Sequence, residues 1–197
     1  MHILEHGQGQ EKTLLFLPCT AEPVWAFEKT VARLAQSWHV FQIVYDGHEP
    51  SYPGDFTSVE QTVDEITDYL RAQGVTCLDA AYGCSLGGSF VGLLAARGNI
   101  RMDYGILGSS DLDQSSKFAA KLQTDLLLPL MFPLLRDGRF KSSLLQKHVE
   151  KQMRQMGDYG AAFLRILGGA RPYLTQQSCK NQFYSDPVSY THLRAHE

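Results

Sequence analysis

One serine is surrounded by the small residues that a nucleophile at a sharp turn needs. It lies in the segment Gly83-Cys84-Ser85-Leu86-Gly87, which follows an apolar run ending at Tyr82 and precedes a helical pattern that ends near Arg97. A strand that turns abruptly into a helix strains the residue at the turn, and flanking glycines let the two elements approach closely. The new helix also directs its free amides and positive dipole end at the turn. We therefore expect Ser85 to carry out covalent chemistry.

Two other interpretations of this segment stay open. Ser85 can be an ordinary turn residue or helix cap in a tight connection, or Cys84 can be the nucleophile in its place. A phosphate-binding loop is excluded because no Gly-Lys-Ser/Thr follows and the glycine spacing differs. The four cysteines have no paired spacing, so we expect reduced, structural thiols and neither a metal ion nor a cofactor. These cysteines are Cys19, Cys77, Cys84 and Cys179.

The first half of the chain alternates strand and helix patterns in the order β-β-α-β-α-β-α-β. This order predicts an α/β fold, a mostly parallel sheet with helices on both faces. Residues 2–6 and 13–17 flank a Gly-rich turn and are expected to form an opening hairpin. Residues 40–45 and 104–107 are expected to be strands, and the strand before Ser85 is expected to end at Tyr82.

Two helices are expected between these strands. Pro23 suits the first position of a helix, because that position needs no amide donor. Thr57 and Glu60 have the spacing of a capping box for the next helix, which is expected to end at Gly74. Each helix has an apolar face, formed by Phe27, Val31 and Leu34 in the first and by Val59, Val63, Ile66 and Leu70 in the second.

Strand patterns stop after Ser110, and the chain to about Gly169 is helical and rich in Leu, Met and Phe. We divide the chain into a core at 1–110, a helical cap at 111–180 and an irregular segment at 181–197. The last ten residues, 188–197, continue no periodicity and resemble translated adaptor sequence, so we expect a non-native tail there. One face of a cap helix is expected to pack on the domain, and it consists of Leu145, Val149, Met153 and Met156.

Composition and charge limit the kinds of molecule that we expect this protein to bind. The chain has 197 residues, 44% of them apolar, which suits one domain with a hydrophobic core. The formal net charge is −3 without a Lys/Arg cluster, which argues against a nucleic-acid partner. We read no secretory signal, and the apolar run 126–135 is about half the length of a membrane-spanning helix. We therefore expect a cytoplasmic protein that binds a small-molecule substrate, with its oligomeric state open.

Three stretches, in order along the chain, resemble the α/β-hydrolase superfamily of serine hydrolases. Residues 83–87 resemble its nucleophile elbow. Residues 14–20 resemble the strand and loop before its oxyanion hole, with Pro18-Cys19 in place of His-Gly. Residues 45–48 resemble its Asp-x-x-Gly-His-Gly stretch, with Glu49 where the second glycine is usual. The resemblance implies an α/β-hydrolase fold with a helical cap inserted after the sixth strand, and a C-terminal truncation that leaves the last strands missing.

The resemblance also implies roles for single residues. Ser85 corresponds to the nucleophile, and the amides of Leu86 and Thr20 correspond to the oxyanion hole, with Cys19 as the weaker choice for the second amide. His48 matches a structural histidine that braces its loop by hydrogen bonding. Each oxyanion donor typically contributes about 3 kcal/mol to transition-state stabilisation.

The acid and base of a catalytic triad are not identified. In the family an Asp or Glu and then a His follow the nucleophile. Asp111 and Asp113 follow the last expected strand but suit helix caps or a solvated loop equally well. His148 is expected to be an exposed or packing residue of the cap, and His192 and His196 lie in the expected tail.

The sequence thus predicts a serine hydrolase that cleaves a small ester, thioester or amide with an apolar group. An acyltransferase uses the same nucleophile and differs in the acceptor of the acyl group. A catalytically inactive binding protein or fragment of this fold is the alternative from another class.

Overall fold

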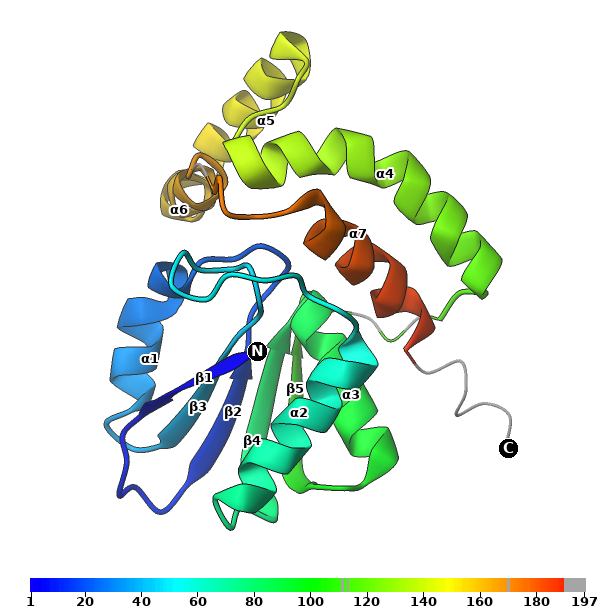
Figure 1. Cartoon of the computed structure of the whole chain (residues 1–197). Coiled ribbons are helices and arrows are strands. Elements are labelled where there is room, and N and C mark those ends of the chain that lie inside the picture. The colour runs from blue at the N-terminus through cyan, green and yellow to red at the C-terminus, as the bar shows by residue number, and fades with distance from the viewer. Residues whose placement is uncertain (111, 113, 170, 190–197) are drawn as a thin grey trace.

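A computed structural model describes residues 1–110, 112, 114–169 and 171–189. Its described residues form one sheet of five strands in the order β1-β3-β2-β4-β5, in which β1 is antiparallel and the other strands are parallel (Figure 1). The strands are β1 (His2–His6), β2 (Thr13–Leu17), β3 (His39–Val44), β4 (Cys77–Cys84) and β5 (Arg101–Gly108). The expected mostly parallel sheet is confirmed.

The expected opening hairpin is wrong, because β1 and β2 do not pair. β3 lies between them and pairs with β1 on one side and with β2 on the other. The physical reason is burial: β3 is buried from Val40 to Val44, whereas every residue of β1 is at least partly exposed. The more apolar strand takes the interior position, and the turn-rich segment between β1 and β2 is long enough to cross one strand.

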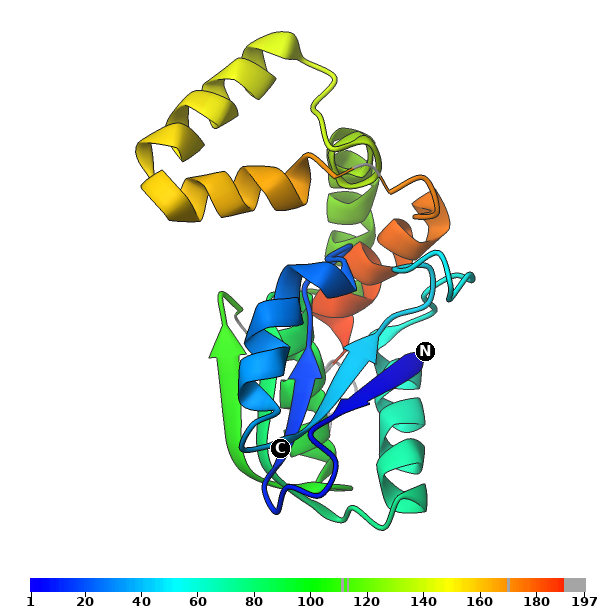
Figure 2. The same ribbon diagram turned by 90° about the vertical axis from the view of Figure 1, so that its left-hand side faces the viewer.

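Helices cover both faces of the sheet, as predicted (Figure 2). The helices α2 (Val59–Ala72) and α3 (Leu86–Arg97) pack on one face, where they share the larger apolar core with β2, β3 and β4. The helix α1 (Glu28–Leu34), which follows the short 3-10 helix η1 (Val24–Phe27), packs on the other. The predicted apolar face of α2 is fully buried. In this arrangement the C-terminal ends of β2 and β4 lie next to the start of α3.

Two helix starts differ slightly from the prediction. Ser58, not Thr57, caps α2, since its hydroxyl oxygen accepts a hydrogen bond from the Gln61 amide at 3.1 Å. Pro23 lies one position before η1 rather than within it, in an extended conformation. Extended backbone is usual for the residue that precedes a helix. Each of the two helix starts differs from the expected position by one residue.

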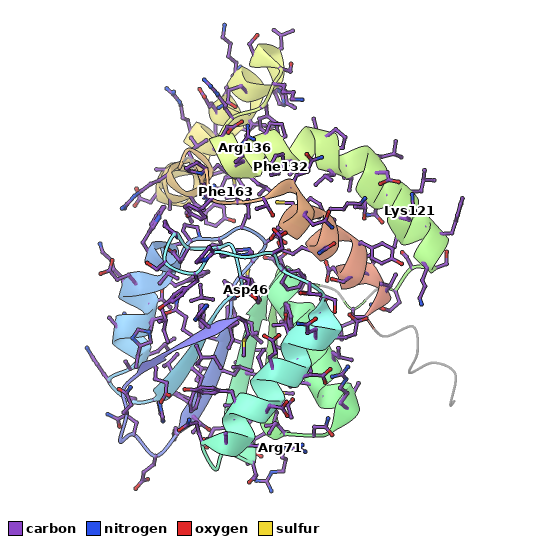
Figure 3. All side chains as sticks on the ribbon, in the orientation of Figure 1. Asp46, Arg71, Lys121, Phe132, Arg136 and Phe163 are labelled. Carbon is purple, nitrogen blue, oxygen red and sulfur yellow. The ribbon has the colours of Figure 1, made fainter. Side chains whose placement is uncertain are left out.

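The helical cap follows β5, the fifth strand among the described residues, and not a sixth strand as the resemblance implied. It consists of α4 (Lys117–Asp137), α5 (Ser143–Gln155) and α6 (Gly157–Leu167). Figure 3 labels Phe132 and Arg136 on α4, where the guanidinium lies 5.1 Å from the ring centroid. By length and mean hydropathy alone α4 is long and apolar enough to cross a bilayer, and 22% of its most apolar 18-residue window is buried inside the protein. α5 contacts mainly α6, and none of its residues is fully buried. Met156, the last residue of the expected apolar face, lies just past its end and is 51% exposed.

The chain returns to the core through α7 (Gln176–Ser185) and the 3-10 helix η2 (Asp186–Val188). The Phe56 amide donates to the Ser178 hydroxyl at 2.9 Å, and the Val59 amide donates to the Ser185 hydroxyl at 3.3 Å. Residue 180, the expected end of the cap, falls inside α7, so residues 181–185 are helical rather than irregular. Val188 and Ser189 of the expected tail are buried, and residues 190–197 lie outside the described part of the chain.

β5 forms the outer edge of the sheet, and its apolar side chains are open to solvent. Tyr104 is 71% exposed and Ile106 is 48% exposed. An edge strand with unpaired backbone groups and exposed apolar side chains is a site for further strand pairing or for aggregation.

Candidate active site

Ser85 occupies the turn between β4 and α3, and its backbone is strained. Its φ is 49° and its ψ is −116°, a conformation that residues with a side chain rarely adopt. Hydrogen bonds hold both of its backbone polar groups: its amide donates to the Gly108 carbonyl, and its carbonyl accepts from the Gly88 amide and the Ser110 hydroxyl, each at 2.8 Å. The side chain is exposed, and its hydroxyl has no hydrogen-bond partner among the described residues. The turn therefore presents a free hydroxyl to solvent.

Two glycines make this turn possible. A Cβ on Gly83 would lie 2.1 Å from the Gly87 carbonyl oxygen, and one on Gly87 would lie 2.3 Å from the Leu17 carbonyl oxygen. Real Cβ atoms do not approach backbone that closely, so any side chain at either position would push α3 away from the strands. The structure agrees here with the close approach expected from the sequence.

The loop after β2 forms the other wall of the site. The Cys19 amide donates to the Glu22 carboxylate at 3.1 Å, whereas the amides of Thr20 and Leu86 have no hydrogen-bond partner among the described residues. A bonded amide cannot also donate to an oxyanion without giving up its carboxylate. Thr20 and Leu86 are therefore better candidate donors than Cys19.

His48 is a structural residue in this fold. It is 3% exposed, its Nε2 accepts a hydrogen bond from the Ala21 amide at 3.0 Å, and its Nδ1 lies 3.2 Å from the Asp46 carbonyl oxygen. The Gln182 side-chain amide lies 3.0 Å from the same Nε2 and ties α7 to the loop. Burial lowers the pKa of His48 to about 4, so the ring is neutral at pH 7. Its contacts agree with the expected bracing role.

The stability of the fold should depend on pH through His48. Between about pH 6.5 and about pH 4 an unfolded chain protonates this ring while the folded chain does not, so the free energy of unfolding falls as the pH is lowered. The His48 contribution is complete above about pH 6.5 and amounts to about 3 kcal/mol at most. Urea unfolding of wild type and a His48→Gln variant across this range measures it. The difference between the two proteins should shrink toward low pH, and a constant difference would contradict the assignment.

No candidate general base contacts Ser85 in the part of the chain that the structure describes. His148 was expected to be either an exposed or a packing residue, and it is exposed on α5. Asp111, Asp113, His192 and His196 lie outside the described residues. The structure thus brings together the nucleophile candidate and the two amide candidates, without an acid or a base.

The site also contains a pair of thiols that sequence reasoning missed. Cys19 Sγ lies 2.9 Å from Cys84 Sγ. The signal was available, because β2 and β4 were both expected in a parallel sheet and each is followed or ended by a cysteine. Without the strand order, however, nothing showed that β2 and β4 are neighbours. Among the described residues no group of three or more His, Cys, Asp or Glu is placed to hold a metal ion.

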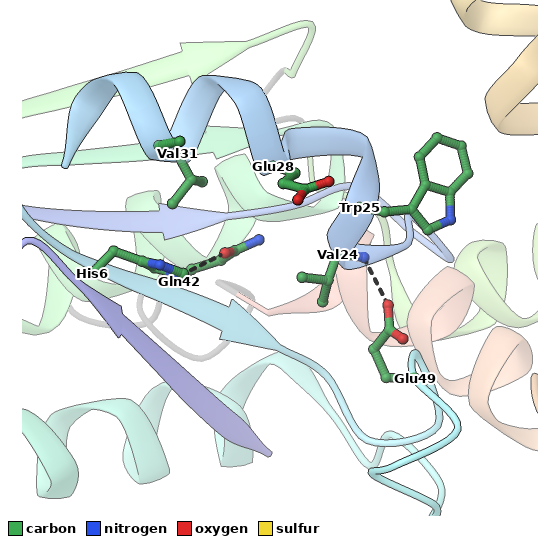
Figure 4. A pocket seen from close by; sticks show the side chains of 8 residues that line it. His6, Val24, Trp25, Glu28, Val31, Gln42 and Glu49 are labelled. Carbon is green, nitrogen blue, oxygen red and sulfur yellow. Dashed lines mark hydrogen bonds between the residues drawn. The ribbon is translucent and has the colours of Figure 1, made fainter.

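A cavity of about 550 Å³ lies elsewhere, between α1 and the β1–β3 edge of the sheet (Figure 4). His6 and Gln42 are hydrogen-bonded to each other in it at 3.1 Å, and Glu49 accepts a hydrogen bond there from the Val24 amide. Ser85 does not line this cavity. Three of its polar side chains, His6, Gln42 and Glu49, are thus hydrogen-bonded within the protein, and no residue of the elbow lines the cavity.

Comparison with known proteins finds relatives by structure alone. No family model and no curated protein match the sequence. An α/β-hydrolase family protein from Desulfitobacterium hafniense matches with a TM-score of 0.71 and 16% identity, over 98% of this chain and 74% of that chain. An enol-lactonase from Burkholderia xenovorans matches with a TM-score of 0.61 and 15% identity, over 95% and 70%. The bottromycin epimerase BotH, solved with bottromycin A2, has a TM-score of 0.62 and 10% identity, over 94% and 69%.

The three structural matches extend over 94% to 98% of this chain. At such low identity they show the architecture rather than the reaction. The chain therefore has the α/β-hydrolase fold.

Proposed function

We propose that this protein is a serine hydrolase that cleaves a small ester, thioester or amide carrying an apolar group. The observation that carries the proposal is the backbone of Ser85, which is strained and fixed by hydrogen bonds while its hydroxyl is exposed. Strain of this kind persists where the surrounding structure enforces it, and it is concentrated at functional sites. An ordinary helix cap needs no such conformation, and the Ser85 side chain makes no capping hydrogen bond.

The reaction begins with attack of the Ser85 hydroxyl oxygen on the substrate carbonyl carbon. The carbonyl oxygen becomes an oxyanion, which the amides of Leu86 and Thr20 stabilise, and the positive end of the α3 dipole adds to this effect. The leaving group departs and an acyl-enzyme remains, which water then hydrolyses. A base must accept the serine proton. No residue in the described part of the chain contacts Ser85 as such a base, so a different residue must supply it.

The cap supports an apolar substrate group. The segment between β5 and α7 is rich in Leu, Met and Phe, side chains that suit an apolar acyl or alcohol group. The enol-lactonase neighbour cleaves, by its name, an ester in a ring, which is the same class of bond. An acyltransferase would use the same steps and resolve the acyl-enzyme with an alcohol instead of water.

Labelling with a fluorophosphonate probe tests the proposal, because such probes react with activated serines. The probe should modify Ser85 in the folded protein and not in the heat-denatured protein, with the site identified by peptide mass spectrometry. Ser109 is a matched control, since it is also exposed, has a φ of 50° and follows the neighbouring strand β5. The Ser109→Ala variant should label like wild type. Labelling at Ser109, or at many serines equally, would overturn the assignment of Ser85.

A catalytically inactive binding protein is the second candidate, favoured by one observation: no histidine contacts Ser85 among the residues that the structure describes. The epimerase among the structural neighbours illustrates that this architecture also supports reactions other than hydrolysis. A folded chain in which the probe leaves Ser85 unmodified, while the purified protein retains a bound apolar ester, would favour this candidate.

A further inference from the structure

Two cysteines meet where the oxyanion loop and the elbow meet. β2 and β4 are parallel neighbours with Leu17 opposite Gly83, so Cys19 and Cys84 follow the paired residues at the same end of the sheet. Their sulfur atoms are 2.9 Å apart, and a disulfide requires about 2.05 Å. Both residues are half-buried and therefore accessible to a small molecule. The two sulfur atoms must therefore approach each other by about 0.9 Å to form the bond.

The two thiols have different chemical characters. The Cys19 thiol donates its hydrogen bond to Cys84 Sγ, and the Tyr82 hydroxyl also donates to that sulfur. These hydrogen bonds hold the pKa of Cys84 below that of an ordinary thiol, whereas the same contact and burial raise the pKa of Cys19. A thiolate attacks oxidants, and a neighbouring protonated thiol can then resolve the product. The pair thus has an attacking member and a resolving member.

We propose that Cys19 and Cys84 are a redox-modification site that forms a reversible intramolecular disulfide on reaction with a hydroperoxide. The Cys84 thiolate attacks one oxygen of the hydroperoxide, so the O–O bond breaks, an S–O bond forms, and water or an alcohol leaves after taking up a proton. Cys84 is then a sulfenic acid. The Cys19 sulfur attacks it, the S–S bond forms, the S–O bond breaks, and the released hydroxide leaves as water with the Cys19 proton. Two electrons pass from the thiol pair to the peroxide.

The disulfide would link the two walls of the site. Cys84 directly precedes Ser85, and Cys19 directly precedes Thr20, one of the two amide candidates. The Cys19 amide is hydrogen-bonded to the Glu22 carboxylate, so any shift of the Cys19 backbone on disulfide formation would disturb this bond and the adjoining Thr20 amide. If the proposed function holds, oxidation should therefore slow the reaction of Ser85 with a fluorophosphonate by at least about tenfold, because preorganised oxyanion donors contribute that much or more.

Peptide mapping after peroxide treatment tests the disulfide independently of any activity. The folded protein is treated with hydrogen peroxide, its free thiols are alkylated, and the linked peptides are identified. We expect one Cys19–Cys84 linkage that a dithiol reductant reverses. The Cys77→Ser variant is the matched control, because Cys77 is half-buried at the opposite end of β4 and should not affect the linkage. In a Cys19→Ser variant Cys84 should stop at the sulfenic acid, which dimedone traps.

The outcomes separate this inference from the proposed function. A folded protein that forms no Cys19–Cys84 linkage, or that links these cysteines to Cys77 or Cys179 as often as to each other, overturns the inference. A protein that forms the linkage but never reacts with the fluorophosphonate supports the redox site and contradicts the hydrolase. Slower labelling after oxidation, restored by the reductant, supports both.

Discussion

Replacing Ser85 by alanine is expected to reduce hydrolysis of an apolar ester by a factor on the order of a thousand or more. The reason is that the variant lacks the oxygen that attacks the carbonyl, while both amide candidates stay in place. The measurement is the rate of release of a chromogenic leaving group from a short acyl ester, at substrate concentrations that give kcat and KM separately. The loss should appear in kcat, with KM changed little. Activity that survives in Ser85→Ala and disappears in Cys84→Ser would transfer the nucleophile role to the thiol.

A second variant at the same position separates chemistry from folding. Ser85→Gly also lacks the nucleophile, but glycine adopts the φ of 49° without the strain that a Cβ causes. We expect Ser85→Gly to be more stable than Ser85→Ala by about 1 kcal/mol, with both inactive. Urea unfolding of the two variants measures this difference. Equal stabilities would show that the turn is not strained, which would remove the observation on which the nucleophile assignment depends.

The local patterns around the site could be predicted because they depend on neighbouring residues only. An apolar run, a small-residue turn and a helical pattern are enough to place Ser85 between β4 and α3. The buried face of α2 likewise follows from its periodicity. These features are set by local backbone geometry and by the number of residues per turn, both of which can be read along the chain.

The order of the strands could not be predicted in the same way. β1 and β2 are separated by a short Gly-rich turn, which normally indicates a hairpin, yet β3 lies between them. The interior position in the sheet goes to the strand that is more apolar over its whole length. This property has to be compared between strands that are far apart in the sequence. The thiol pair of Cys19 and Cys84 was missed for this reason, because it depends on β2 and β4 being neighbours.

The bracing of the site from α7 was also beyond sequence reasoning. Gln182 reaches the buried ring of His48 across 134 positions of the chain, and it comes from a segment that was expected to be irregular. The residues that α7 buries are mostly polar, namely Ser178, Cys179, Gln182 and Ser185. Hydrophobic periodicity cannot detect this face of α7, because the face stabilises the protein through hydrogen bonds with the loops of the core.

Replacing Gly87 by alanine is expected to destabilise the protein by about 3 kcal/mol or more, an effect at the upper end for overpacking. The new Cβ would lie 2.3 Å from the Leu17 carbonyl oxygen and 3.1 Å from that of Pro18. Both atoms belong to backbone at the end of β2, so no side-chain rotation can relieve the clash. α3 must move away from the sheet, and Leu86 must move with it.

The matched control is Gly169→Ala, whose Cβ would have ordinary contacts, the nearest at 3.6 Å, and which should change stability by no more than about 0.5 kcal/mol. Urea unfolding gives both values, provided that the slope with denaturant is the same as in wild type. Because Gly87 directly follows Leu86 and contacts the backbone that leads to Thr20, its alanine variant should also lose reactivity at Ser85 under conditions where it is still folded. A stable and reactive Gly87→Ala protein would mean that α3 does not approach β2 this closely, and the proposed oxyanion site would lose its geometric basis.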